Sequence, residues 1–124
     1  MTLPKVVYVA GPFRCASTHA PGQQDHWGIH HNIMNAMAYA LEIWRMGAAA
    51  VCPHGNTFCF QNAAPDDVWL TGDLAILRKC DAVYMLPTWQ QSSGARAERD
   101  FAVNEGVPVF YDLGELGAWL KEGV

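Results

Sequence analysis

The chain has 124 residues and a formal net charge of −4; 51% of its residues are hydrophobic and 16% are charged. This composition excludes a disordered or fibrous protein, and the length is typical of a single domain with one core. The 8 Lys and Arg residues are scattered, which argues against a nucleic-acid polymer as partner, because phosphate backbones require clustered positive charge. The negative net charge does not exclude a small nucleotide as ligand, because a small nucleotide needs only a local anion site.

The first strand pattern follows a short N-terminal segment. Residues 6–10 form an apolar, β-branched run that ends at Gly11-Pro12, a sharp turn. Residues 14–28 are polar and predict a long loop, a length often associated with ligand binding. The segment 29–46 is expected to be a helix that Gly47 ends. Its apolar residues at helical spacing are Ile33, Met37, Leu41 and Trp44.

The middle of the chain repeats this strand–loop–helix order. Residues 48–52 predict a second strand, and residues 54–65 predict a loop. A helix is expected over 66–78, with Asp66 or Asp67 as its N-cap.

The last third gives two more strands and two more helices. Residues 82–86 form a wholly apolar strand of the kind that is buried on both faces. The loop 87–93 precedes a helix that Ser92 or Ser93 caps and that runs to about Glu105. A strand at 107–111 and a short helix at 113–121 complete the chain.

Strands and helices therefore alternate throughout, which predicts a parallel sheet of four or five strands with helices on both faces. We expect residues 1–124 to form one α/β domain of the flavodoxin-like or Rossmann-like type. Ligands of such sheets bind beyond the carboxyl ends of the strands. Here that edge contains Gly11-Pro12-Phe13, Pro53-His54 and the loop 87–93.

The segment from Ser92 to Glu98 is the strongest candidate site. It opens a helix after a buried strand, so backbone N–H groups and the hydroxyls of Ser92 and Ser93 converge on the ligand edge, as an anion site requires. Gly94 permits close approach of a ligand, and Glu98 shares a helix face with small alanines. The alternative is that the serines only cap the helix and that Glu98 is a solvated surface residue.

Asp73 is the second candidate. It shares a helical stripe with apolar residues, and a carboxyl group in such surroundings acquires the raised pKa that a general acid needs. The alternative is an exposed helix residue, because most aspartates lie at the surface.

Other polar and aromatic residues receive simpler interpretations. His54 and Asn56 are expected at the mouth of the pocket, or as turn residues after Pro53. Trp89 is placed to stack on a base, whereas Trp44 and Trp69 are expected in the core. The histidines and 4 cysteines match no established zinc spacing, so we expect no metal and no other cofactor.

Three segments together resemble the nucleoside 2-deoxyribosyltransferase superfamily. They are Tyr8-Val9-Ala10-Gly11-Pro12-Phe13, the stretch from Gly72-Asp73-Leu74 to Cys80-Asp81-Ala82-Val83, and Ser92-Ser93-Gly94 followed by Glu98. They occur in the same order and cover most of residues 6–111. Pro87-Thr88-Trp89 with Ser93-Gly94-Ala95 resembles a small bacterial and phage branch of the superfamily.

The resemblance implies a role for each matching residue. Glu98 attacks the anomeric carbon to give a covalent glycosyl-enzyme, Asp73 holds or protonates the departing base, and Tyr8 orients the nucleophile. Ser92 contacts a 5′-phosphate, and Gly11 lines the sugar site. Transferases of the superfamily commonly carry an acidic residue just before the catalytic glutamate, but residues 90–93 contain none. Serines there favour a nucleotide hydrolase.

The resulting expectation is a cytoplasmic enzyme that cleaves or transfers the N-glycosidic bond of a nucleoside or a nucleoside 5′-monophosphate. No apolar stretch approaches the roughly 20 residues that cross a bilayer, and the first residues do not resemble a signal peptide. The alternatives are a nucleotide-binding module without catalysis and an NAD-cleaving hydrolase. Because related enzymes complete their pockets with a neighbouring subunit, we expect a homo-oligomer. The helical segment 32–46 would then form an isologous interface, or it simply packs on its own sheet.

Overall fold

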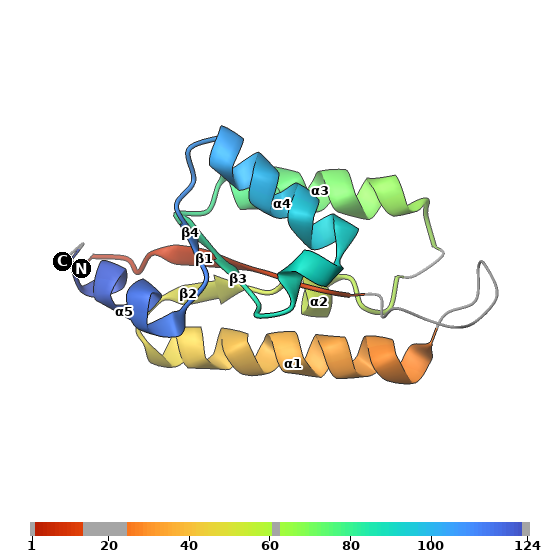
Figure 1. Cartoon of the computed structure of the whole chain (residues 1–124), viewed down its shortest axis with the longest axis horizontal. Coiled ribbons are helices and arrows are strands. Elements are labelled where there is room, and N and C mark those ends of the chain that lie inside the picture. Colours follow the sequence, from red (N-terminus) through yellow and green to blue (C-terminus); the bar gives the residue numbers. More distant parts are fainter. Residues whose placement is uncertain (1, 14–24, 61–62, 123–124) are drawn as a thin grey trace.

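A computed structural model describes residues 2–13, 25–60 and 63–122 of the chain. Within these residues one parallel sheet contains β1 (Val6–Ala10), β2 (Ala49–Val51), β3 (Ala82–Met85) and β4 (Val109–Phe110). The strand order is β2-β1-β3-β4, with β1 and β3 at the centre (Figure 1). This order is that of the flavodoxin-like fold, and it confirms the predicted single α/β class.

Helices cover both faces of the sheet. α1 (His26–Arg45) and α5 (Leu113–Glu122) lie on one side, and α3 (Asp66–Arg78) and α4 (Ser93–Asn104) lie on the other (Figure 1). Alternate residues of β1 point to opposite faces, so Val7 and Val9 pack towards α1, whereas Tyr8 and Ala10 pack towards α3 and α4. The two resulting cores hold the carboxyl ends of β1 and β3 in fixed positions.

α1 begins earlier than the sequence pattern predicts. The side chain of Asp25 accepts a hydrogen bond from the Gly28 backbone N–H, so residues 26–28 of the predicted loop are helical. The remainder of that loop, residues 14–24, lies outside the described residues. Gly47 adopts a φ of 93° at the other end and terminates the helix as predicted.

The predicted apolar face of α1 is wrong in part. Ile33 is buried, but Met37, Leu41 and Trp44 are 46%, 49% and 55% exposed, so Trp44 does not lie in the core. The sheet is instead contacted by small side chains, Ala36 and Ala40, together with Ile43. Close approach of α1 to the strands therefore leaves its larger apolar residues on the outside.

The predicted loop 54–65 also contains regular structure. The short helix α2 (Pro53–Asn56) covers the start of this segment, and Pro53 occupies its first turn. Residues 61–62 lie outside the described residues. α3 has the predicted bounds, but the predicted Asp66 or Asp67 N-cap is wrong because Pro65 occupies that position. Both aspartates lie in the first turn, where their charge favours the helix dipole.

The connection from β3 to α4 positions the candidate site. A short 3-10 helix, η1 (Trp89–Gln91), lies within the predicted loop 87–93. Ser92 is the N-cap of α4, and its Oγ accepts a 3.2 Å hydrogen bond from the Ala95 backbone N–H, as predicted. Among the helices that the structure describes, none is both long and apolar enough to cross a membrane.

Candidate active site

A cavity of about 560 Å³ lies at the carboxyl edge of the sheet. The connection after β1 runs to one face and the connection after β3 runs to the other, so the cavity lies at the topological switch point. Residues from the end of β1, from α2 and α3, and from the start of α4 line it: Gly11, Phe13, Pro53, His54, Thr57, Asp66, Asp67, Trp69, Leu70, Asp73, Gln91, Ser92, Ser93, Gly94, Ala95 and Glu98.

Glu98 is buried at the inner side of this cavity, with only 8% of its surface exposed. It shares the buried face of α4 with Ala95 and Ala102, as the helical spacing predicted. The hydroxyl of Tyr8, at the centre of β1, donates a hydrogen bond to its Oε2. Glu98 is therefore not a solvated surface residue, and the sheet holds its carboxyl group in one orientation.

The surroundings of Glu98 favour its protonated form. Burial raises the pKa of Glu98 from 4.5 to about 7; the nearby charge of Asp73 adds to this shift, and the Tyr8 hydrogen bond opposes it. Burial and the neighbouring carboxyl groups raise the pKa of Tyr8 far above its ordinary value. Tyr8 therefore remains a hydrogen-bond donor across the whole physiological range.

Asp73 lines the same cavity from α3. It is neither fully buried nor fully exposed, and burial raises its pKa from 3.8 to about 6. A carboxyl group with this pKa carries a proton in part of the molecules near neutral pH, which a general acid requires. The structure thus brings Glu98, Asp73 and the Tyr8 hydroxyl to one site, although Tyr8 itself is fully buried beneath it.

The start of α4 forms another part of the cavity wall. Ser92, Ser93 and Gly94 line it, and the first N–H groups of a helix attract an anion. A Cβ atom at Gly94 would approach only the Ser92 Oγ, at 3.8 Å, so this glycine leaves open space beside the cavity. Arg96 does not contribute, because it is exposed and its guanidinium donates to the Gln90 carbonyl.

The end of β1 is tied to α2 beside the cavity. His54 is buried, and the carbonyl of Pro12 lies 2.8 Å from its Nε2. Since a carbonyl only accepts, Nε2 carries the proton of the neutral ring, and burial lowers the pKa of His54. Its Nδ1 has no hydrogen-bond partner among the described residues. Gly11, Phe13 and His54 line the cavity, whereas Pro12 contributes only this carbonyl.

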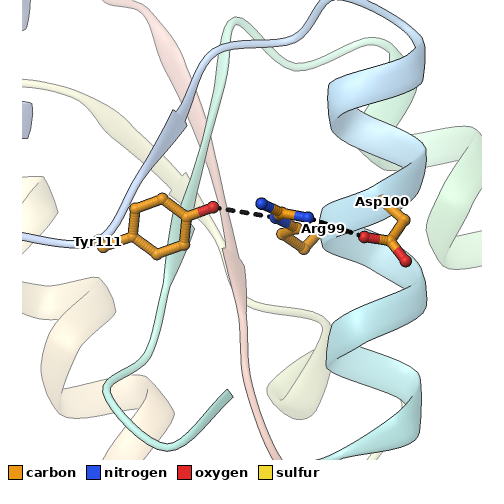
Figure 2. Close-up of polar contacts among 3 residues, drawn as sticks. All are labelled: Arg99, Asp100 and Tyr111. Atoms are coloured by element: carbon orange, nitrogen blue, oxygen red, sulfur yellow. Dashed lines mark hydrogen bonds and ion pairs between the residues drawn. The ribbon is translucent and has the colours of Figure 1, made fainter. Parts of the chain in front are cut away.

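Two predicted ligand contacts lie elsewhere. Asn56 is exposed and lies outside the cavity lining. Trp89 is turned away by η1 and packs against the Tyr111 ring, 5.7 Å between centroids, and beneath the Arg99 guanidinium. Arg99 in turn donates to the Tyr111 hydroxyl at 3.0 Å and to Asp100 at 3.1 Å (Figure 2). Trp89 therefore packs in this cluster and does not line the cavity.

Several lining residues were not predicted. Trp69, expected in the core, lines the cavity, and its Nε1 is buried without a hydrogen-bond partner among the described residues. Asp66 and Asp67 line it too, because a helix that follows a parallel strand begins at the strand's carboxyl edge. That rule was available from the sequence alone and would have identified both aspartates. The remaining additions are Thr57, Leu70, Gln91 and Ala95.

Among the described residues, His54 is the one histidine in the lining of this site, and no cysteine lines it. Cys52, Cys59 and Cys80 are free thiols, and Cys52 and Cys80 pack at the edges of the two cores. Within the described part of the chain, no three His, Cys, Asp or Glu residues are arranged to hold a metal ion.

Comparison with known proteins identifies one family. Residues 29–111, which include most of α1 and all of α3, β3 and α4, match the model described as a domain of unknown function, DUF4406. No match was found among curated proteins.

Proposed function

The chain belongs to the DUF4406 family, and we propose that it cleaves or transfers the N-glycosidic bond of a nucleoside or a nucleoside 5′-monophosphate. The observation that carries this proposal is the buried Glu98 carboxyl group, held by the Tyr8 hydroxyl in a cavity that Asp73 also lines. Two carboxyl groups that face one cavity, one to attack the sugar and one to donate a proton, are the equipment of a retaining glycosidase.

In the proposed reaction Glu98 acts as the nucleophile. An oxygen of its carboxylate forms a bond to the anomeric carbon while the bond from that carbon to the base nitrogen breaks, and the bonding electrons leave with the base. Tyr8 stabilises the ionised form of Glu98 before the attack and holds the attacking oxygen in place. The product of this step is a glycosyl ester of Glu98.

Asp73 supplies the proton that the departing base takes up. Its ionised form then accepts a proton from water as the water oxygen attacks the anomeric carbon, and the carboxylate of Glu98 is released. A second base in place of water gives transfer instead of hydrolysis. The neighbouring Asp67 adds negative charge to the wall from which Asp73 projects, which favours a base that becomes more positive as it is protonated.

The start of α4 is the part of the cavity suited to a 5′-phosphate. Among the lining residues that the structure describes, none is Lys or Arg, and the anion donors at the start of α4 are its backbone N–H groups and the serine hydroxyls. The resemblance to the nucleoside 2-deoxyribosyltransferase superfamily supports the same orientation, with the phosphate at Ser92 and the base towards Asp73.

The test is chromatographic detection of free base after incubation with nucleosides, 5′-monophosphates and NAD. Wild-type protein is expected to release base from at least one of them, and Glu98→Gln, which keeps the shape and loses the nucleophile, is expected to lower the rate at least 1,000-fold. Glu122→Gln, at an exposed position of α5, is the matched control and should retain full activity. Undiminished base release by folded Glu98→Gln protein would refute the proposal.

A binding module without catalysis is the second candidate, since residues 90–93 lack the carboxylate that transferases use on the sugar. Thermal stabilisation by a nucleotide, with no base released after prolonged incubation, would favour it. Base release from NAD alone would instead identify an NAD-cleaving hydrolase.

A further inference from the structure

The outer face of α1 carries a row of large apolar side chains that stay about half exposed or more, although Met37 also lies beside Gly55 of α2. Trp27, Met34, Met37, Leu41 and Trp44 are 71%, 52%, 46%, 49% and 55% exposed. The helix already contacts the sheet through Ala36, Ala40 and Ile43 on its other side. α1 therefore has two apolar faces, and the described residues bury one of them and leave most of the other exposed.

The spacing of this row is that of a helix–helix seam. Trp27, Met34 and Leu41 recur every seven residues, and so do His30, Met37 and Trp44. Together they occupy the a and d positions of successive heptads, which form one stripe along a helix. We call these six residues the α1 stripe.

The α1 stripe is also symmetric about its own midpoint, which lies between Asn35 and Ala36. Trp27 and Trp44 are equally far from that point, as are Met34 and Met37, and His30 and Leu41. In an antiparallel helix pair the a positions of one helix face the d positions of the other. A second copy would thus place tryptophan against tryptophan at both ends and methionine against methionine at the centre.

The charge and the exposed area of the α1 stripe also fit a second copy of the chain as partner. Glu42 and Arg45 are the only Asp, Glu, Lys or Arg residues of α1, and they pair with each other at 2.8 Å, so the face carries no net charge to repel a copy of itself. The exposed side chains of the stripe offer roughly 600 Å² per copy, close to the roughly 800 Å² per partner of a standard interface. Residues flanking the stripe on a helix roughly 30 Å long can supply the remainder.

We propose that the protein is a two-fold symmetric homodimer in which the α1 stripe packs antiparallel against the same stripe of a second copy. Trp27 then lies opposite Trp44 of the second copy, and Met34 lies opposite Met37. This interface is isologous, as a closed dimer requires. It is independent of the reaction proposed above.

Sedimentation velocity over a range of protein concentrations tests the dimer. Wild-type protein is expected to be a dimer, and Met34→Glu, which places two carboxylates near the axis, is expected to weaken association at least 100-fold. Val103→Glu is the matched control, because Val103 is 53% exposed on α4, away from the stripe, and should leave the dimer intact. Circular dichroism verifies that each variant is folded.

Two outcomes overturn the dimer: wild-type protein that stays monomeric at every concentration, which would leave the stripe to a different partner, and Met34→Glu protein that associates as tightly as Val103→Glu protein.

A pair of double variants tests the antiparallel register. Trp27→Lys with Trp44→Glu sets opposite charges against each other at both ends, whereas Trp27→Lys with Trp44→Lys sets like charges there. The first is expected to associate at least tenfold more tightly than the second. A parallel pair would place like residues together in both variants, so equal association of the two would overturn the proposed register.

Discussion

The buried carboxyl group of Glu98 makes the stability of the protein depend on pH. A glutamate in the unfolded chain ionises near 4.5, whereas burial holds the pKa of Glu98 at about 7 in the folded protein. Between these values the folded state keeps a proton that the unfolded state has released. The contribution of Glu98 to stability is therefore full below pH 4.5 and is lost as the pH rises to about 7.

Glu98→Gln is expected to change this dependence. The amide keeps an acceptor for the Tyr8 hydroxyl but cannot ionise. At pH 4 the variant should match the wild type, and at pH 8 it should be more stable by up to ~3 kcal/mol. Urea unfolding at both pH values measures the difference, and Glu122→Gln, at an exposed position, should differ little from the wild type at either. The same dependence of stability on pH in Glu98→Gln and in the wild type would contradict the raised pKa of Glu98.

Asp73 and Glu98 together set the expected pH profile of base release. The reaction needs Glu98 ionised and Asp73 protonated, so the rate should be highest between about pH 6 and about pH 7, where the pair holds one proton. Asp73→Asn removes the acid and the negative charge that raises the pKa of Glu98. We expect a rate about 100-fold lower, a single acid limb set by Glu98 at or below about pH 7, and no alkaline limb.

Profiles of kcat/KM against pH for wild type and Asp73→Asn check this expectation. An unchanged alkaline limb in the variant would assign that limb to another group and would remove Asp73 from the role of acid.

At the scale of the elements, the sequence patterns predicted where α1 lies in the chain but not which of its faces is buried. Caps and stops, such as Gly47, are local features that a sequence displays directly. The buried face is decided by which side chains let the helix approach the sheet, and here these are Ala36 and Ala40. The larger apolar residues of α1 gave the stronger helical pattern in the sequence, although they lie on the exposed face of the helix.

The candidate site was predictable to the extent that strand order dictates it. Gly11, Glu98 and the start of α4 lie at the carboxyl edge because parallel strands end there. The position of Trp89 was not predictable, because η1 rotates it towards Tyr111 and Arg99 by a turn that no pattern marks. The opposite error, with Trp69 assigned to the core, arose because a cavity wall and a core face have the same apolar spacing.

The turn after β1 permits a matched comparison of two glycines. A Cβ atom at Gly11 would lie 2.3 Å from the Leu86 Cδ1, whereas one at Gly72, inside α3, would meet nothing within 4 Å. Gly11→Ala is therefore expected to lower the free energy of unfolding by about 1–3 kcal/mol, and Gly72→Ala to raise it by about 0.5–1 kcal/mol. Urea denaturation measures both, and equal effects would contradict the close packing of Leu86 on Gly11.

For the whole molecule, the sheet separates two features, the cavity and the α1 stripe. The cavity opens where α2, α3 and α4 meet the carboxyl edge of the sheet. The α1 stripe lies on the exposed side of α1, and α1 covers the face of the sheet opposite α3 and α4 (Figure 1). Alternation along the chain predicted this division of helices between faces. It did not reveal that one helix carries an unused apolar side, because exposure depends on how the finished layers pack.

The contact between Tyr8 and Glu98 joins positions 90 residues apart. During synthesis β1 emerges well before α4, so the tyrosine hydroxyl has no carboxylate partner until the last quarter of the chain arrives. Contacts between distant segments form late and set the pace of folding. No N-terminal fragment that stops before α4 contains the assembled cavity, and the ability to bind ligand there is consequently a marker of completed folding.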